Sequence, residues 1–213
     1  MNAAQQQDLA DDLAYVRTLA EEGAHAPLVS GRYFLIWGTV MAAASGFVYL
    51  GVLGLVPFSG AGYMLPWVIA GILGWVLTFT LGARSWTKPG AATLGNKTAS
   101  AVWFAVGIMM TLFFVAINFT HARYVSDGVP ASFMFTMLFP ISFGMYGIAF
   151  YATAVAARTP WLKGFAILAL AIAMLSFFLL TSPHQFLVGA IGIVACAVVP
   201  GLILMAREPA ELV

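Results

Sequence analysis

Two neighbouring apolar stretches carry the polar side chains with the best spacing for a binding site. Hydroxyl, amide and aromatic groups recur there at helical intervals, within residues 100–120 and 131–155. Pro140 has no N–H for the carbonyl oxygen of Thr136, which is therefore left without its helical partner. A free carbonyl beside hydroxyl and amide groups predicts a polar cavity, although hydrogen bonding between helices would also explain these groups. The candidate cavity residues are Thr111, Asn118, Ser132, Thr136, Pro140 and Tyr151.

Histidines are the second set of candidate ligands. His121 and His184 both fall at predicted helix ends on the same membrane face, where two imidazoles could bind a metal or haem. Interfacial histidines without any ligand would give the same pattern. Cys196 is the single cysteine, which excludes an intrachain disulfide or a Cys-rich metal cage. We expect no cofactor, and no pair of nucleophile and base predicts an enzyme.

Charged side chains avoid the apolar stretches. Only 8% of the 213 residues are charged and 62% are hydrophobic, whereas a soluble domain has about 25% charged residues. No Asp, Glu, Lys or Arg lies well inside a long apolar stretch, which disfavours transport coupled to protons or Na⁺. A pathway for a neutral or lipidic solute stays open. The net charge of +1 gives no electrostatic reason to expect nucleic-acid binding.

Six apolar stretches must position the candidate residues. Each approaches the roughly 20 residues that a helix needs to cross a hydrocarbon core of about 30 Å. Backbone groups in lipid need internal partners, and the stretches are too uniformly apolar for barrel strands. We therefore predict an all-α membrane protein, with a six-helix transmembrane bundle within residues 31–207 and a cytosolic tail at 208–213. The predicted helices span residues 33–55, 63–83, 100–120, 131–155, 161–181 and 186–205.

Lys and Arg residues gather in alternate gaps between these stretches. Eight of the nine lie before the first stretch, after the second, after the fourth, or in the tail, and only Arg123 lies in another gap. Because cytoplasmic loops are enriched in Lys and Arg, both termini are predicted to be cytoplasmic. Residues 121–130 form the longest predicted outer loop, which leaves little room for a periplasmic domain.

Residues 1–30 predict a cytosolic amphipathic helix followed by a connector. Leu9, Leu13 and Val16 share one apolar stripe, and the acidic residues lie off it. This helix either docks on the basic inner loops or presents its stripe to a partner.

A stripe of small residues lies on the first predicted transmembrane helix. Gly38, Ala42 and Gly46 recur every four residues, which lets another helix approach closely. The stripe fits packing within the bundle, and it equally fits contact with a second copy or with a partner in a larger membrane complex.

Two segments resemble parts of small, uncharacterised six-helix bacterial inner-membrane proteins. They are residues 12–37, DLAYVRTLAEEGAHAPLVSGRYFLIW, and residues 146–163, YGIAFYATAVAARTPWLK. The resemblance implies a bacterial inner membrane and this topology, and it supplies neither an activity nor a catalytic residue.

Three functional hypotheses follow from the sequence. The first is a non-enzymatic accessory, scaffolding or regulatory subunit that works through helix contacts, because the outer loops are short and ionisable groups are absent from the apolar stretches. The second is a transporter or channel for a neutral or lipidic solute. The third is a haem- or metal-binding redox subunit that uses the two outer histidines. A structure in which the region of residues 100–120 and 131–155 is packed solid, without a pore or groove, would count against the second.

Overall fold

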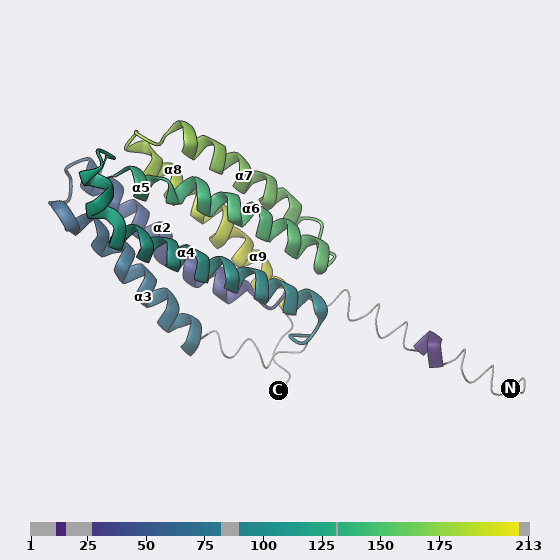
Figure 1. Ribbon diagram of the computed structural model, residues 1–213. Helices are drawn as coiled ribbons and strands as arrows, with labels where there is room; N and C mark the ends of the chain where they lie inside the picture. Colours follow the sequence, from purple (N-terminus) through teal and green to yellow (C-terminus); the bar gives the residue numbers. More distant parts are fainter. Residues whose placement is uncertain (1–11, 16–26, 82–89, 131, 209–213) are drawn as a thin grey trace, which may run out of the picture.

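The computed structural model describes residues 12–15, 27–81, 90–130 and 132–208. Within these ranges the chain is helical with no strand, and five helices are long and apolar enough to cross a membrane (Figure 1). These findings confirm the prediction of an all-α protein with several helices that can cross a membrane. The helices are α2 (Gly31–Val52), η1 (Gly60–Met64), α3 (Leu65–Thr80), α4 (Leu94–Ser126), α5 (Phe133–Thr136), α6 (Leu138–Ala156), α7 (Leu162–Phe178), α8 (His184–Ile193), η3 (Val194–Val198) and α9 (Val199–Arg207). The apolar helix α7 has only 17 residues.

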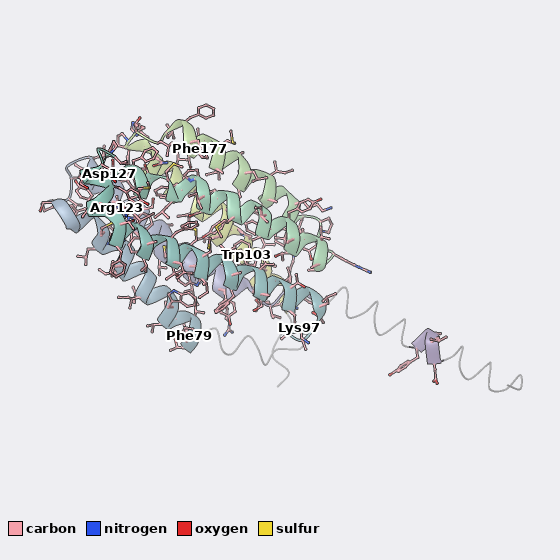
Figure 2. The ribbon with its side chains drawn as sticks, in the orientation of Figure 1. Phe79, Lys97, Trp103, Arg123, Asp127 and Phe177 are labelled. Carbon is pink, nitrogen blue, oxygen red and sulfur yellow. The ribbon has the colours of Figure 1, made fainter. Side chains whose placement is uncertain are left out.

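The helices form two layers. In one layer α6 packs between α4 and α7, and in the other α2 packs between α3 and the continuous helix α8–η3–α9 (Figure 1). The chain enters α2 and leaves α9 at the same end of the bundle, where the Gly31 N–H donates to the Glu208 carboxylate over 3.1 Å. Lys97 lies near this end, and Arg123 and Asp127 lie at the opposite end (Figure 2).

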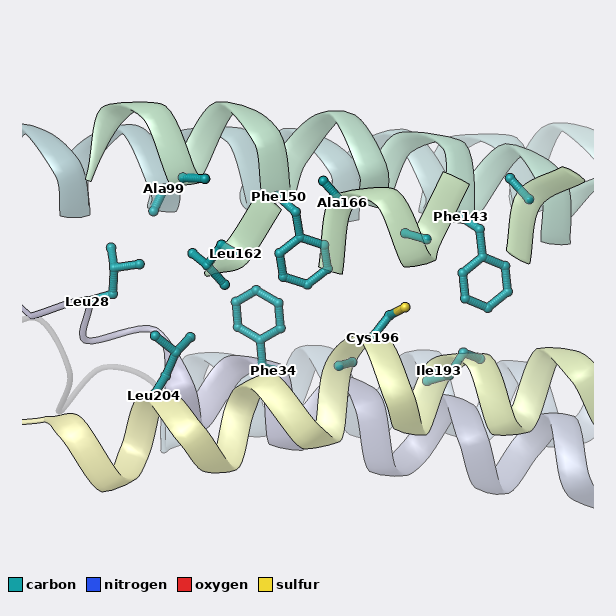
Figure 3. Packing of buried hydrophobic residues seen from close by; sticks show 14 of the residues in the cluster. Leu28, Phe34, Ala99, Phe143, Phe150, Leu162, Ala166, Ile193, Cys196 and Leu204 are labelled. Atoms are coloured by element: carbon teal, nitrogen blue, oxygen red, sulfur yellow. The ribbon is translucent and has the colours of Figure 1, made fainter. Parts of the chain in front are cut away.

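Small residues let the two layers meet on the α7 side. Ala169 and Cys196 are fully buried there, and Phe143 is only 1% exposed (Figure 3). A Cβ atom added to Gly192 would lie 2.7 Å from the Phe143 ring, so no larger residue fits at that position. Ala166, Ala173 and Ser176 of α7 are buried as well. The small side chains of α7 and α8 therefore serve packing within the bundle.

The first two residues of the small-residue stripe on α2, Gly38 and Ala42, face the interior of the bundle. A Cβ atom on Gly38 would lie 2.9 Å from Ala197 Cβ and 3.0 Å from the Val198 backbone nitrogen, both in the π-helical turn η3. Ala42 packs against the buried core. Gly46, by contrast, has no neighbour within 4 Å of an added Cβ. Gly38 and Ala42 are thus used within the chain.

Replacing Gly38 with alanine is expected to destabilise the bundle by about 1–3 kcal/mol, because the added methyl group meets backbone that cannot move aside. Gly46→Ala on the same helix is the matched control. It should be neutral or stabilising by up to about 1 kcal/mol, since alanine is the better helix former. Thermal unfolding in mild detergent measures both, and equal melting temperatures for the two variants would contradict the packing described.

Helix α4 is longer than the sequence predicts, because its stop signal lies further along the chain. The helix continues through Ser126, so the prediction of an outer loop over residues 121–130 is wrong for its first part. Gly128 ends the helix with φ +85°, and the Val129 N–H donates to the Tyr124 carbonyl over 2.9 Å. This arrangement is a Schellman cap, which glycine favours.

Other boundaries also differ from the prediction. The segment predicted at 131–155 divides into α5 and α6 at Met137, three residues before Pro140, as expected where a proline interrupts the helical hydrogen bonds. Of the predicted N-terminal stripe, Leu13 lies in a helical turn at 12–15 and is 62% exposed. Leu9 and Val16 lie outside the described residues.

Candidate functional site

The two layers diverge on the side of α3 and α4 and surround a cavity of about 1480 Å³. Pockets for small molecules typically measure about 300–1,000 Å³, so this space admits a larger ligand. Helix α3 packs on α2 and helix α4 packs on α6, and α3 and α4 make few direct contacts with each other. They form the outer walls of the cavity, and α2 and α6 lie behind them.

Aromatic rings cover much of the cavity wall. Phe34 and Trp103 meet edge to face with ring centroids 4.5 Å apart, and Phe150 lies 4.8 Å from Trp103 behind them. These rings join α2, α4 and α6, and Trp103 projects from the half of α4 nearer to Lys97 (Figure 2). Edge-to-face packing holds such rings in fixed orientations. Further aromatic residues that line the cavity are Tyr33, Trp37, Tyr63, Trp67, Trp75, Phe79, Phe104, Phe114, Phe135, Phe139, Phe143, Tyr146 and Phe186.

Three tryptophans tie successive walls of the cavity together, each by donating its indole N–H to a threonine hydroxyl. Helix α2 is joined to α3, α3 to α4, and α4 to α6. A buried indole N–H needs such an acceptor, because lipid supplies none. The three pairs are Trp37–Thr78 at 2.9 Å, Trp75–Thr111 at 3.2 Å and Trp103–Thr153 at 3.2 Å.

Trp75 is the bridge between the two outer walls. Its ring lies 5.4 Å from Trp37 and 6.0 Å from Phe104, in both cases edge to face. The Thr111 hydroxyl, which accepts the Trp75 N–H, donates in turn to the Gly107 carbonyl over 2.8 Å. Trp75 therefore fixes the spacing of α3 and α4 without filling the cavity.

The cavity is uncharged along its described lining, which contains no Asp, Glu, Lys or Arg. Its polar side chains lie near both ends and also between them, at Thr111 and Ser142. Asn96 and Ser100 lie near the start of α4, while Asn118 and His121 lie near the end of this helix. Such a surface favours a molecule with an apolar body and small polar groups.

Four of the six candidate cavity residues line this space: Thr111, Asn118, Ser132 and Thr136. Pro140 and Tyr151 do not, because their face of α6 turns toward α7. Gly147, on that face, would place a Cβ atom 2.6 Å from Leu170 of α7. Tyr151 is 57% exposed and lies under the Lys163 ammonium group, 5.8 Å from it.

The carbonyl of Thr136 is not free, contrary to the expectation from Pro140. Gln185 Nε2 donates to it over 3.0 Å and donates also to the Ser176 carbonyl over 2.9 Å. Gln185 is completely buried. An amide from another helix thus replaces the N–H that proline lacks. The sequence signal was a lone glutamine at the start of the last apolar stretch.

The two outer histidines have different neighbours. His121 lines the cavity and lies 5.5 Å from the Phe135 ring, whereas His184 Nδ1 lies 3.1 Å from the Tyr49 hydroxyl. Among the described residues, no three His, Cys, Asp or Glu side chains are grouped to hold a metal ion.

The chain matches no protein-family model, no curated protein sequence and no solved structure. Function is therefore inferred from the shape and the lining of the cavity.

Proposed function

We propose that the protein binds a neutral, lipid-like molecule in the cavity between α3 and α4 and holds or carries it within the bilayer. The observation that carries this proposal is a cavity of about 1480 Å³ whose described lining is largely aromatic and aliphatic and has no charged side chain. A charged solute would need a counter-charge at membrane depth, because transfer of an ion from water into apolar surroundings is costly.

The length of the cavity fits an extended molecule. Its lining residues on α4 run from Asn96 to His121, and 25 residues of helix rise about 37 Å. This span is comparable to the hydrocarbon thickness of a bilayer, about 30 Å. Apart from the bridge at Trp75, α3 and α4 make few direct contacts, so we place the entry of a lipid-like molecule from the membrane between these two helices.

The proposal places six helices across a bacterial inner membrane, with both termini cytoplasmic. The contact of Gly31 with Glu208 supports an even number of crossings, because α2 begins where α9 ends. Helix α7 then completes the six. Its 17 residues lie at the short end of the range for a spanning helix, about 17–25. Arg32, Lys97, Arg158 and Arg207 share the proposed inner end, and Arg123 lies at the outer end.

An accessory subunit that works through helix contacts has less support from the geometry. The small-residue stripe that suggested it is used internally at Gly38 and Ala42. The exposed apolar faces of the helices need no partner other than lipid.

A cavity-filling variant tests the proposed function. Gly71 lines the cavity, and an added Cβ atom there meets nothing within 4 Å. We expect Gly71→Trp to fold normally and to lower the occupancy of a co-purified apolar molecule about tenfold, which corresponds to about 1.4 kcal/mol of binding free energy. Native mass spectrometry of the detergent-purified chain, followed by extraction of its lipids, measures occupancy.

Gly164→Trp is the matched control, because Gly164 is exposed on α7 and an added Cβ atom there also meets nothing within 4 Å. This variant should retain the bound molecule. A wild-type protein that carries no apolar molecule, or equal occupancy in both variants, would overturn the proposal.

A further inference from the structure

A second, smaller pocket lies at the end of the bundle where α6 turns into α7 and α9 ends. It measures about 350 Å³, and Arg158, Thr159, Trp161 and Arg207 contribute its polar lining. We propose that this pocket binds the phosphate group of an anionic membrane lipid. The site is separate from the α3–α4 cavity, and the proposal does not depend on the function assigned to that cavity.

Two guanidinium groups give the pocket its charge. Arg158 and Arg207 are both exposed, and no carboxylate lines the pocket among the described residues. Glu208, the neighbouring acid in the sequence, accepts the Gly31 N–H over 3.1 Å and is not part of the lining. Guanidinium groups match phosphate oxygens in geometry and in charge. Paired arginines therefore favour a phosphate ligand.

Trp161 lines the pocket and packs against one of its two guanidinium groups. Its Nε1–H is buried and has no acceptor within the described chain. The Arg207 guanidinium carbon lies 5.0 Å from the Trp161 ring centroid, a cation–π distance that holds the guanidinium beside the indole.

The backbone at Arg158 is unusual and holds this residue in place. Arg158 has φ +49° at the end of α6, where the Thr159 N–H donates to the Ala154 carbonyl over 2.9 Å. Glycine or asparagine normally occupies this position of a helix cap. Arg158 thus stands at a position where glycine would fit the backbone better.

The surroundings favour a lipid over a soluble phosphate. Leu28 and Leu204 form an apolar wall of the pocket, and Ile167 and Met205 present exposed apolar side chains on the adjoining helices α7 and α9. A lipid can place its phosphate on the arginines while its acyl chains lie along these helices. Basic pockets between transmembrane helices on the cytoplasmic side bind lipid headgroups in this way.

Thermal unfolding of the full chain in neutral detergent tests the site, with phosphatidylglycerol, phosphatidylcholine or inorganic phosphate added in turn. We expect phosphatidylglycerol to raise the melting temperature with a saturable dependence on concentration, and phosphatidylcholine to do so much less. Arg158→Gly and Arg207→Gln should each lower the affinity for phosphatidylglycerol about fivefold, so that about five times more lipid is needed for half of the rise in melting temperature. This is the change expected when one basic residue near a membrane surface is lost. Arg158→Gly removes the charge, and glycine readily adopts the positive φ at this position. A weaker response of this variant to the lipid would therefore not result from misfolding.

Two further variants sharpen the test. Trp161→Phe keeps an aromatic ring under Arg207 and removes only the buried N–H group, so it should retain binding of phosphatidylglycerol. Arg123→Gln, at the opposite end of the bundle, should leave binding unchanged. The proposal is overturned if the two lipids act equally or if both arginine variants bind phosphatidylglycerol like the wild type. Inorganic phosphate that stabilises as well as phosphatidylglycerol would overturn the lipid assignment.

Discussion

Replacing Gln185 with leucine is expected to lower the free energy of unfolding by about 2–4 kcal/mol, although leucine is apolar and similar in size. The amide group of Gln185 donates to the Thr136 and Ser176 carbonyls over 3.0 and 2.9 Å, and the residue is completely buried. Leucine offers no donor, and Pro140 has no N–H to take over at Thr136. A carbonyl would then remain unpaired in an apolar interior, which costs about 1–3 kcal/mol.

Asn118→Leu is the matched control for this prediction. Asn118 is also an amide in an apolar helix, but its Nδ2 donates to the Phe114 carbonyl of the same helix over 2.8 Å. Leucine should therefore change the stability by less than about 0.5 kcal/mol, as is usual away from buried networks. Melting temperatures in the same detergent compare the two variants. If they were equally stable, Gln185 would not be the group that holds α5, α7 and α8 together.

The helical fold follows from the sequence because lipid leaves few alternatives. Long apolar stretches must satisfy their own backbone groups, so their helical state and their order were readable without any tertiary information. Five of the described helices are long enough to cross a membrane, and α7 is shorter, with 17 residues. The residues at which the helices begin and end were harder to predict. Helix α4 runs to Ser126 because Gly128 supplies the cap, whereas the predicted apolar segment ends at residue 120, just before the polar residue His121. Polar side chains near a membrane surface do not stop a helix, but a glycine with positive φ does.

The cavity was only partly predictable. Spacing along one helix identified Thr111 and Asn118 as facing the same way, and both line the cavity. Spacing could not show that Thr111 accepts the N–H of Trp75, because that contact depends on how α3 and α4 approach each other. Tyr151 was misplaced for the same reason. Its face of α6 is polar enough to suggest a cavity, yet α7 covers the neighbouring Gly147.

Asn96 is the second position where a single substitution should have a large effect. It is 5% exposed at the start of α4, and its Oδ1 accepts the Val29 N–H over 2.9 Å. Its Nδ2 donates to the Pro27 and Gly90 carbonyls over 2.9 and 3.0 Å. One side chain thus fastens the connector before α2 to the turn before α4. Asn96→Ala is expected to destabilise the protein by about 2–4 kcal/mol, because the buried Val29 N–H loses its acceptor and the Pro27 carbonyl loses its donor.

Asn96→Asp distinguishes the hydrogen bond that Asn96 accepts from the hydrogen bonds that it donates. A carboxylate keeps an acceptor for the Val29 N–H but has no donor for the Pro27 and Gly90 carbonyls, which its charge would repel. We therefore expect the aspartate variant to be at least as unstable as the alanine variant. Hydrogen exchange at the Val29 amide should become faster in Asn96→Ala, whereas Ser100→Ala, one turn along α4, should leave it unchanged. If the aspartate variant matched the wild type in melting temperature, the acceptor alone would hold the connector, and the two donor bonds would contribute little.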